Sequence, residues 1–177
     1  MWLNKNAFKI VALFHFSHII YYFTSMDPHY FMNAAYQEAL KAFDEGDVPV
    51  GAVIEHEGRI IGRGYNRIEK CVDASAHAEI LAIGAASSLL QSWRLNGCTL
   101  YVTLEPCLMC LGAILQCRLD AVVYGAADPR LGAFDAHFHR QEAERAYRYF
   151  PTVTSGIMKD ECGALLRSFF DTIREKK

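Results

Sequence analysis

The sequence lacks several features that would assign it to a common functional class. Its 18 Lys and Arg are outnumbered by 20 Asp and Glu, for a formal net charge of −2, so any nucleic-acid binding would rest on a local patch. No glycine-rich loop follows the first expected strand, which argues against a Rossmann dinucleotide site. Repeats, low-complexity tracts and interdomain linkers are also absent, so the 177 residues suggest one domain.

No apolar run is long enough for a comfortable membrane span, which needs about 20 residues. The most apolar stretch, residues 7–23, is interrupted by charged and polar side chains, so we expect no membrane partner. We interpret residues 1–25 as an N-terminal extension that results from a mis-assigned start. Asp27 and Pro28, directly after Met26, suit a helix N-terminus. The alternatives are an additional element or tail, and a targeting or membrane segment.

Disulfide patterning is lacking as well. Of the six cysteines, Cys107 and Cys110 alone have the spacing of metal ligands. A disulfide framework is typical of small secreted chains, so we expect the others to be reduced and structural, in a cytoplasmic protein. These others are Cys71, Cys98, Cys117 and Cys162.

Strand-like and helix-like segments alternate along the rest of the chain. Apolar residues at three- and four-residue steps, ended by Gly46, predict a first helix. The whole pattern predicts an α/β fold, with one mixed sheet and helices on both faces. We expect helices over 28–45, 77–90, 107–117, 140–150 and 160–177, and strands over 50–56, 59–66, 98–105 and 120–126.

One cluster of residues indicates chemistry. His77 opens a predicted helix, and Cys107 and Cys110 lie in the first turn of another, where helix polarity favours thiolates. Imidazole and thiolate are zinc ligands, and three protein ligands leave the open position of a catalytic site. Glu79, two residues after His77, is placed to act as a proton shuttle beside that position. The alternatives are a structural zinc site, completed by a fourth residue, and buried core cysteines.

The same residues lie in sequence blocks that resemble a known family. The blocks, in order, are DVPVGAVI (47–54), GYNR (64–67), AHAEI (76–80), TLYVTLEPCLMCLGA (99–113) and VVYGAADPRLGA (122–133). They are similar to those of the tRNA adenosine deaminases, in the zinc-dependent cytidine/deoxycytidylate deaminase superfamily. The resemblance covers roughly residues 28–173, so we expect 26–177 to form the deaminase domain.

The resemblance implies a three-layer α/β/α fold with a five-stranded mixed sheet, and a homodimer with one Zn²⁺ per subunit. It implies hydrolytic deamination of adenosine to inosine at the wobble position of a tRNA anticodon, by a zinc-activated hydroxide. His77, Cys107 and Cys110 would bind the metal and Glu79 would be catalytic. The implied substrate contacts are Asn66, Val50, Gly51, Ala78 and Asp128.

Two features leave the substrate open. The loop over 128–139 carries Pro129 and a bulky Phe134, where relatives have small and polar residues, which puts the detailed anticodon contacts in question. Late basic residues, including Arg145 and Arg148, would supply phosphate contacts. The alternative function is deamination of free nucleobases such as guanine or cytosine.

Overall fold

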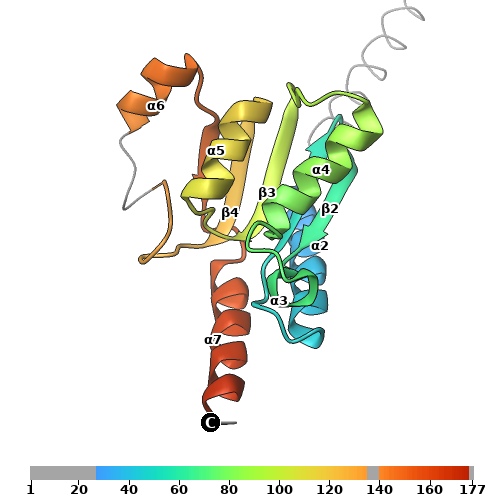
Figure 1. Cartoon of the computed structure of the whole chain (residues 1–177), viewed down its shortest axis with the longest axis vertical. Coiled ribbons are helices and arrows are strands. Elements are labelled where there is room, and N and C mark those ends of the chain that lie inside the picture. Colours follow the sequence, from blue (N-terminus) through green and yellow to red (C-terminus); the bar gives the residue numbers. More distant parts are fainter. Residues whose placement is uncertain (1–26, 135–139, 176–177) are drawn as a thin grey trace, which may run out of the picture.

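The computed structural model describes residues 27–134 and 140–175 (Figure 1). The proposed extension over 1–25 lies outside the described residues. The helices are α2 (Pro28–Asp44), α3 (Ile68–Cys71), α4 (Ala78–Leu90), α5 (Leu108–Cys117), α6 (Arg140–Tyr147) and α7 (Lys159–Glu175). The strands are β1 (Gly51–His56), β2 (Arg59–Tyr65), β3 (Cys98–Leu104), β4 (Ala121–Ala126) and β5 (Thr152–Ser155).

The five strands form one mixed sheet in the order β2-β1-β3-β4-β5. β1 is antiparallel to both β2 and β3, and the expected hairpin turns at Glu57 and Gly58, which both have positive φ. β3, β4 and β5 are parallel, so β3 and β4 end at the same edge of the sheet. The residues that follow these two strands therefore meet at that edge.

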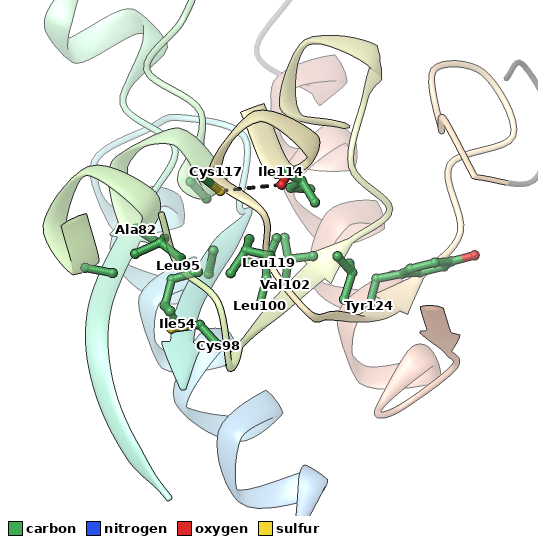
Figure 2. Packing of buried hydrophobic residues seen from close by; sticks show 14 of the residues in the cluster. Ile54, Ala82, Leu95, Cys98, Leu100, Val102, Ile114, Cys117, Leu119 and Tyr124 are labelled. Atoms are coloured by element: carbon green, nitrogen blue, oxygen red, sulfur yellow. Dashed lines mark hydrogen bonds between the residues drawn. The ribbon is translucent and has the colours of Figure 1, made fainter. Parts of the chain in front are cut away.

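Alternating side chains on the central strands pack against helices on opposite faces of the sheet. On one face, even-numbered residues such as Leu100 and Val102 pack with α4 and α5 (Figure 2). On the other face, Val53, Tyr101 and Val123 pack with α2 and α7. The arrangement is the three-layer α/β/α fold that the sequence predicted, and Figure 1 shows α4 and α5 in front of the strands.

The sequence analysis gave no position to two elements, although the resemblance implied a fifth strand. β5 is a four-residue edge strand whose side chains are mostly exposed, so it carries no apolar alternation. α3 is a single turn within a segment expected to be a loop, and it has no buried residue. Both elements depend on tertiary contacts rather than on an apolar pattern. Within the described residues, no helix is long and apolar enough to cross a membrane.

Candidate active site

The two predicted ligand segments meet at the N-termini of α4 and α5. His77 is the N-cap residue of α4, and Cys107 is the N-cap residue of α5. Neither uses its side chain to cap its helix, so both side chains are available to a ligand. Nδ1 of His77 lies 3.8 Å from Sγ of Cys107 and 3.5 Å from Sγ of Cys110.

This geometry fits a tetrahedral zinc ion. Zn–S bonds of about 2.3 Å and Zn–N bonds of about 2.0 Å, at tetrahedral angles, place ligand atoms roughly 3.5–3.8 Å apart. The three ligand atoms lie within 4.8 Å of one another, and no other group of this kind occurs among the described residues. His77, Cys107 and Cys110 are thus positioned to bind a metal ion, as the sequence predicted.

The protonation of the two cysteines also suits a cation. Hydrogen bonds from the Cys110 thiol and the His77 ring lower the pKa of Cys107 to about 3. The neighbouring Cys107 and burial raise the pKa of Cys110, so one sulfur keeps a proton that the other has lost. The hydrogen bond with Cys107 raises the pKa of His77. A zinc ion would take the place of the proton that these groups share.

Glu79 lies in the first turn of α4, next to this cluster. The side chain is 3% exposed, and its Oε2 atom has no hydrogen-bond partner among the described residues. Burial is the largest cause of the raised pKa of this carboxyl. A buried polar atom without a partner costs stability, and such atoms are concentrated at functional sites. The carboxyl therefore suits proton transfer better than a structural role.

Asn66 directly follows β2 and is 5% exposed. Its backbone N–H donates to the carbonyl of Val50, and its Oδ1 atom accepts a hydrogen bond of 3.0 Å from the backbone N–H of Ala78. The second bond settles the orientation of the carboxamide, because only oxygen can accept it. The side-chain NH₂ group is then the part left to contact a ligand.

A cavity of about 660 Å³ opens beside the cluster. It is large enough for a purine base together with neighbouring groups, by comparison with typical ligand pockets of about 300–1,000 Å³. Six predicted site residues are among those that line it: Val50, Asn66, His77, Glu79, Cys107 and Asp128. The site predicted from the sequence is thus largely brought together in one cavity.

Three predicted site residues are not among those that line the cavity. Cys110 is fully buried behind it. Gly51 lies so close to α2 that an added Cβ would clash with the carbonyl of Ala35, so this glycine serves helix packing. Ala78 is buried, and its N–H is taken by Asn66.

The loop after β4 differs in part from the expectation. Asp128 Oδ1 accepts hydrogen bonds from the backbone of Arg130 and Leu131, so the carboxylate organises a turn as well as lining the cavity. Phe134 stacks on Tyr124, with ring centroids 6.0 Å apart and an interplanar angle of 13°. This bulky residue thus packs against the core and is not among the cavity residues. The remainder of the expected loop, 135–139, lies outside the described residues.

Several cavity residues were missed by the sequence analysis. Glu105 lines the cavity although it is 4% exposed. Leu166 and Phe170, one turn apart on α7, also line the cavity, as does Ile68 of α3. The position of Glu105, between a buried strand and the Pro-Cys pair, could have indicated that its carboxylate lies at the site. The sequence of α7 carries no such signal, because its apolar stripe is that of any amphipathic helix.

A model of the zinc-binding region of cytidine and deoxycytidylate deaminases matches residues 25–126. The chain belongs to this deaminase family. A tRNA-specific adenosine deaminase of Bacillus subtilis is 44% identical over 147 residues, which cover 83% of this chain and 91% of that protein. The similarity to this relative extends beyond the zinc-binding region, since the family model matches 102 residues and the alignment with the relative covers 147.

Solved structures give the same assignment. One deaminase from a study of A-to-I editing at the wobble position of transfer RNA superimposes with a TM-score of 0.73 at 40% identity. The match covers 77% of this chain and 98% of that one. A guanine deaminase of Nitrosomonas europaea matches with a TM-score of 0.71 at 25% identity, over 82% of this chain and 86% of that one. The deaminase fold is thus shared by both, and the sequence is more similar to the tRNA deaminase.

Proposed function

We propose that the chain is a zinc-dependent tRNA adenosine deaminase that converts adenosine to inosine at the wobble position of an anticodon. The observation that carries the proposal is a three-ligand metal cluster beside a buried carboxylate that has an unpaired oxygen, at the wall of a base-sized cavity. Its substrate class rests on the 44% identity to a protein named as a tRNA-specific adenosine deaminase. Residues 26–177 form the deaminase domain in this proposal.

His77, Cys107 and Cys110 would hold one zinc ion per subunit. A zinc ion with three protein ligands lowers the pKa of water at its open position to about 7. The chain contributes the N-termini of α4 and α5, whose helix polarity stabilises the thiolates. Since only three protein ligands meet within the described residues, the cluster is of the catalytic rather than the structural type.

Glu79 moves the protons. Its unpaired Oε2 atom would accept a proton from the attacking water and deliver it to N1 of the base. The carboxyl would then take a second proton, from the hydroxyl newly added at C6, and deliver it to the amino group, which departs as ammonia. The raised pKa of this carboxyl favours the protonated form that each delivery requires. The overall reaction adds one water to adenosine and releases one ammonia, with inosine as the product.

The target base would be held by residues along the cavity. The NH₂ group of Asn66 donates to it, Val50 packs against it, and the backbone of Ala78 positions Asn66. Asp128 faces the substrate from the loop after β4. Gly51 acts indirectly, by allowing β1 to approach α2. The anticodon loop is single-stranded, so its bases enter such a cavity at little unpairing cost.

A homodimer and a cytoplasmic location complete the proposal. Leu108 and Met109, at the start of α5, are 51% and 41% exposed and offer an apolar contact surface. Leu111 and Ile114 are buried within the chain's own core and are not part of such a surface. Two cysteine ligands are stable as thiols in a reducing compartment, where tRNA is also found.

The proposal is tested by measuring inosine in tRNA after incubation with the full chain. We expect inosine only at an anticodon wobble position, and none when that adenosine is replaced. Ammonia released from free guanine or cytosine, with no inosine in tRNA, would contradict the tRNA assignment and favour the nucleobase deaminase. Glu79→Gln is the control for contaminating activity.

A further inference from the structure

Glu105 is a second buried carboxylate near the metal cluster, and its surroundings differ from those of Glu79. It follows β3, its side chain is 4% exposed, and its backbone N–H donates to the carbonyl of Ala126 at 2.9 Å. Its Oε2 atom accepts a 3.0 Å hydrogen bond from the N–H of Asp128, and Oε1 accepts a 2.9 Å bond from the N–H of Phe134. One side chain thus holds both ends of the loop over 128–134.

Backbone hydrogen bonds within the 128–134 loop, and from this loop to Pro106, also hold the loop in place. The N–H of Gly132 donates to the carbonyl of Asp128, and the N–H of Ala133 donates to the carbonyl of Pro106. Gly132 also forms a backbone bridge with Cys107. An added Cβ on Gly132 would clash with the Glu105 carboxylate, so this close approach requires glycine.

The two segments that Glu105 joins carry different parts of the site. Cys107, a predicted metal ligand, lies two residues after Glu105 in the chain. The loop that Glu105 binds through its two hydrogen bonds supplies part of the cavity wall, with Asp128, Pro129, Arg130 and Leu131. Leu131 is 53% exposed and Arg130 is also exposed, so this wall has few apolar contacts of its own to hold it in place.

We propose that Glu105 is a positioning residue that fixes the 128–134 loop against the metal-ligand segment and thereby shapes the wall of the cavity that receives the substrate. The inference rests on the proposed function for its substrate, tRNA. Because two backbone N–H groups already point at its two oxygens, Glu105 is committed to the loop and leaves the proton transfers to Glu79. Two hydrogen bonds from backbone N–H groups, one to each oxygen, suit a fixed wall.

The test compares Glu105→Gln with the wild-type chain, both loaded with zinc. A glutamine has one acceptor oxygen, so one of the two loop bonds is lost. We expect amide hydrogen exchange across 128–134 to become about tenfold faster, in line with the loss of one buried hydrogen bond. We expect KM for tRNA to rise about tenfold and kcat to change less than about threefold, because the loop holds substrate rather than moving protons.

Glu38→Gln is the matched control. Glu38 is a glutamate of similar burial, 3% exposed, that accepts bonds from Lys41 and Arg63 on α2 and β2, away from the loop. It should leave loop exchange and KM at wild-type values. Gly132→Ala is a second, independent variant, which pushes the loop from the carboxylate without changing a titratable group. It should reproduce the faster exchange and the higher KM, and it carries the test if Glu105→Gln does not fold.

Three results would overturn the inference. The first is unchanged exchange and unchanged KM in a folded, zinc-loaded Glu105→Gln. The second is loss of zinc in step with loss of activity, which would make Glu105 a support of the metal ligands. The third is a fall in kcat alone, which would make it a proton-transfer group. If the wild-type chain deaminates no tRNA, the proposed function fails, while the exchange measurement still decides whether Glu105 holds the loop.

Discussion

Replacing Glu79 by glutamine should separate activity from stability. Glu79 is 3% exposed, its Oε2 atom has no hydrogen-bond partner among the described residues, and burial raises the pKa of its carboxyl. Glutamine keeps the shape of the side chain but cannot accept and return a proton. The variant should therefore lose the reaction while keeping the fold.

The expected magnitudes follow from these surroundings. A positioned acid or base contributes about 10²–10⁴ in rate, and Glu79 serves in more than one proton transfer, so we expect kcat to fall by at least about 10³, or roughly 4 kcal/mol. The fold should lose little stability, because a neutral amide of the same shape replaces a buried carboxyl whose Oε2 atom has no partner among the described residues. Each kcal/mol gained in the free energy of unfolding would raise the melting temperature by about 2–4 °C for a chain of this size.

The assay measures three quantities on the same preparation: inosine in tRNA, zinc per chain by mass spectrometry, and the melting temperature. The control is again Glu38→Gln, in which the lost acceptor served Lys41 and Arg63. Both partners are about half exposed and screened by water, so the control should lose about 1 kcal/mol or less and stay active. The two glutamates should thus respond in opposite ways.

Two results would refute the reasoning. If Glu79→Gln loses zinc and melts at a lower temperature, Glu79 is a metal ligand, and the cluster is of the four-ligand structural type. If kcat falls less than about tenfold, the carboxyl is not the proton shuttle, because a lost acid or base costs more than that.

Three further predictions concern the site and its support. Asn66→Ala leaves the buried N–H of Ala78 unpaired, so we expect a loss of about 1–2 kcal/mol in chemical unfolding together with a raised KM; an unchanged KM would remove Asn66 from the substrate contacts. Gly51→Ala should lower the free energy of unfolding by about 3 kcal/mol or more, because the added Cβ would clash with the backbone of α2. Circular dichroism should then show little folded protein, whereas a folded variant with a changed KM would place Gly51 in the pocket. With zinc bound, alkylation at pH 8 should modify the exposed Cys71. After chelation of the zinc, alkylation should also modify Cys107, whose pKa is lowered to about 3. Equal labelling of Cys107 with and without the chelator would show that no metal covers it.

The layers of the fold and the metal ligands could be predicted because both depend on short-range patterns. A near-continuous apolar run around Leu100 predicts a strand buried on both faces, and the pair Cys107 and Cys110 has the spacing of metal ligands. The edge strand Thr152–Ser155 has no such pattern, since it is mostly exposed and is held by backbone bonds to β4.

The support of the site could not be predicted for a different reason. The partners of Glu105 lie 23 and 29 residues further along the chain, at Asp128 and Phe134. A carboxylate that accepts backbone N–H groups places no demand on the residue types that donate them. Phe134, whose bulk put the detailed anticodon contacts in question, packs on Tyr124, because strand β4 presents that ring at the point where the loop returns.

The position of each part in the sheet explains how one chemistry can serve different substrates in this family. The metal ligands and Glu79 lie at the starts of α4 and α5, which are anchored in the core by Ala82 and Ile114. The outer wall comes from the loop after β4 and from residues of α7. Substitutions in the wall therefore change what fits the cavity without moving the ligands. A guanine deaminase that shares the fold at 25% identity is consistent with such a division. Exchanging the wall segments between the two proteins should then transfer substrate preference while zinc content stays constant.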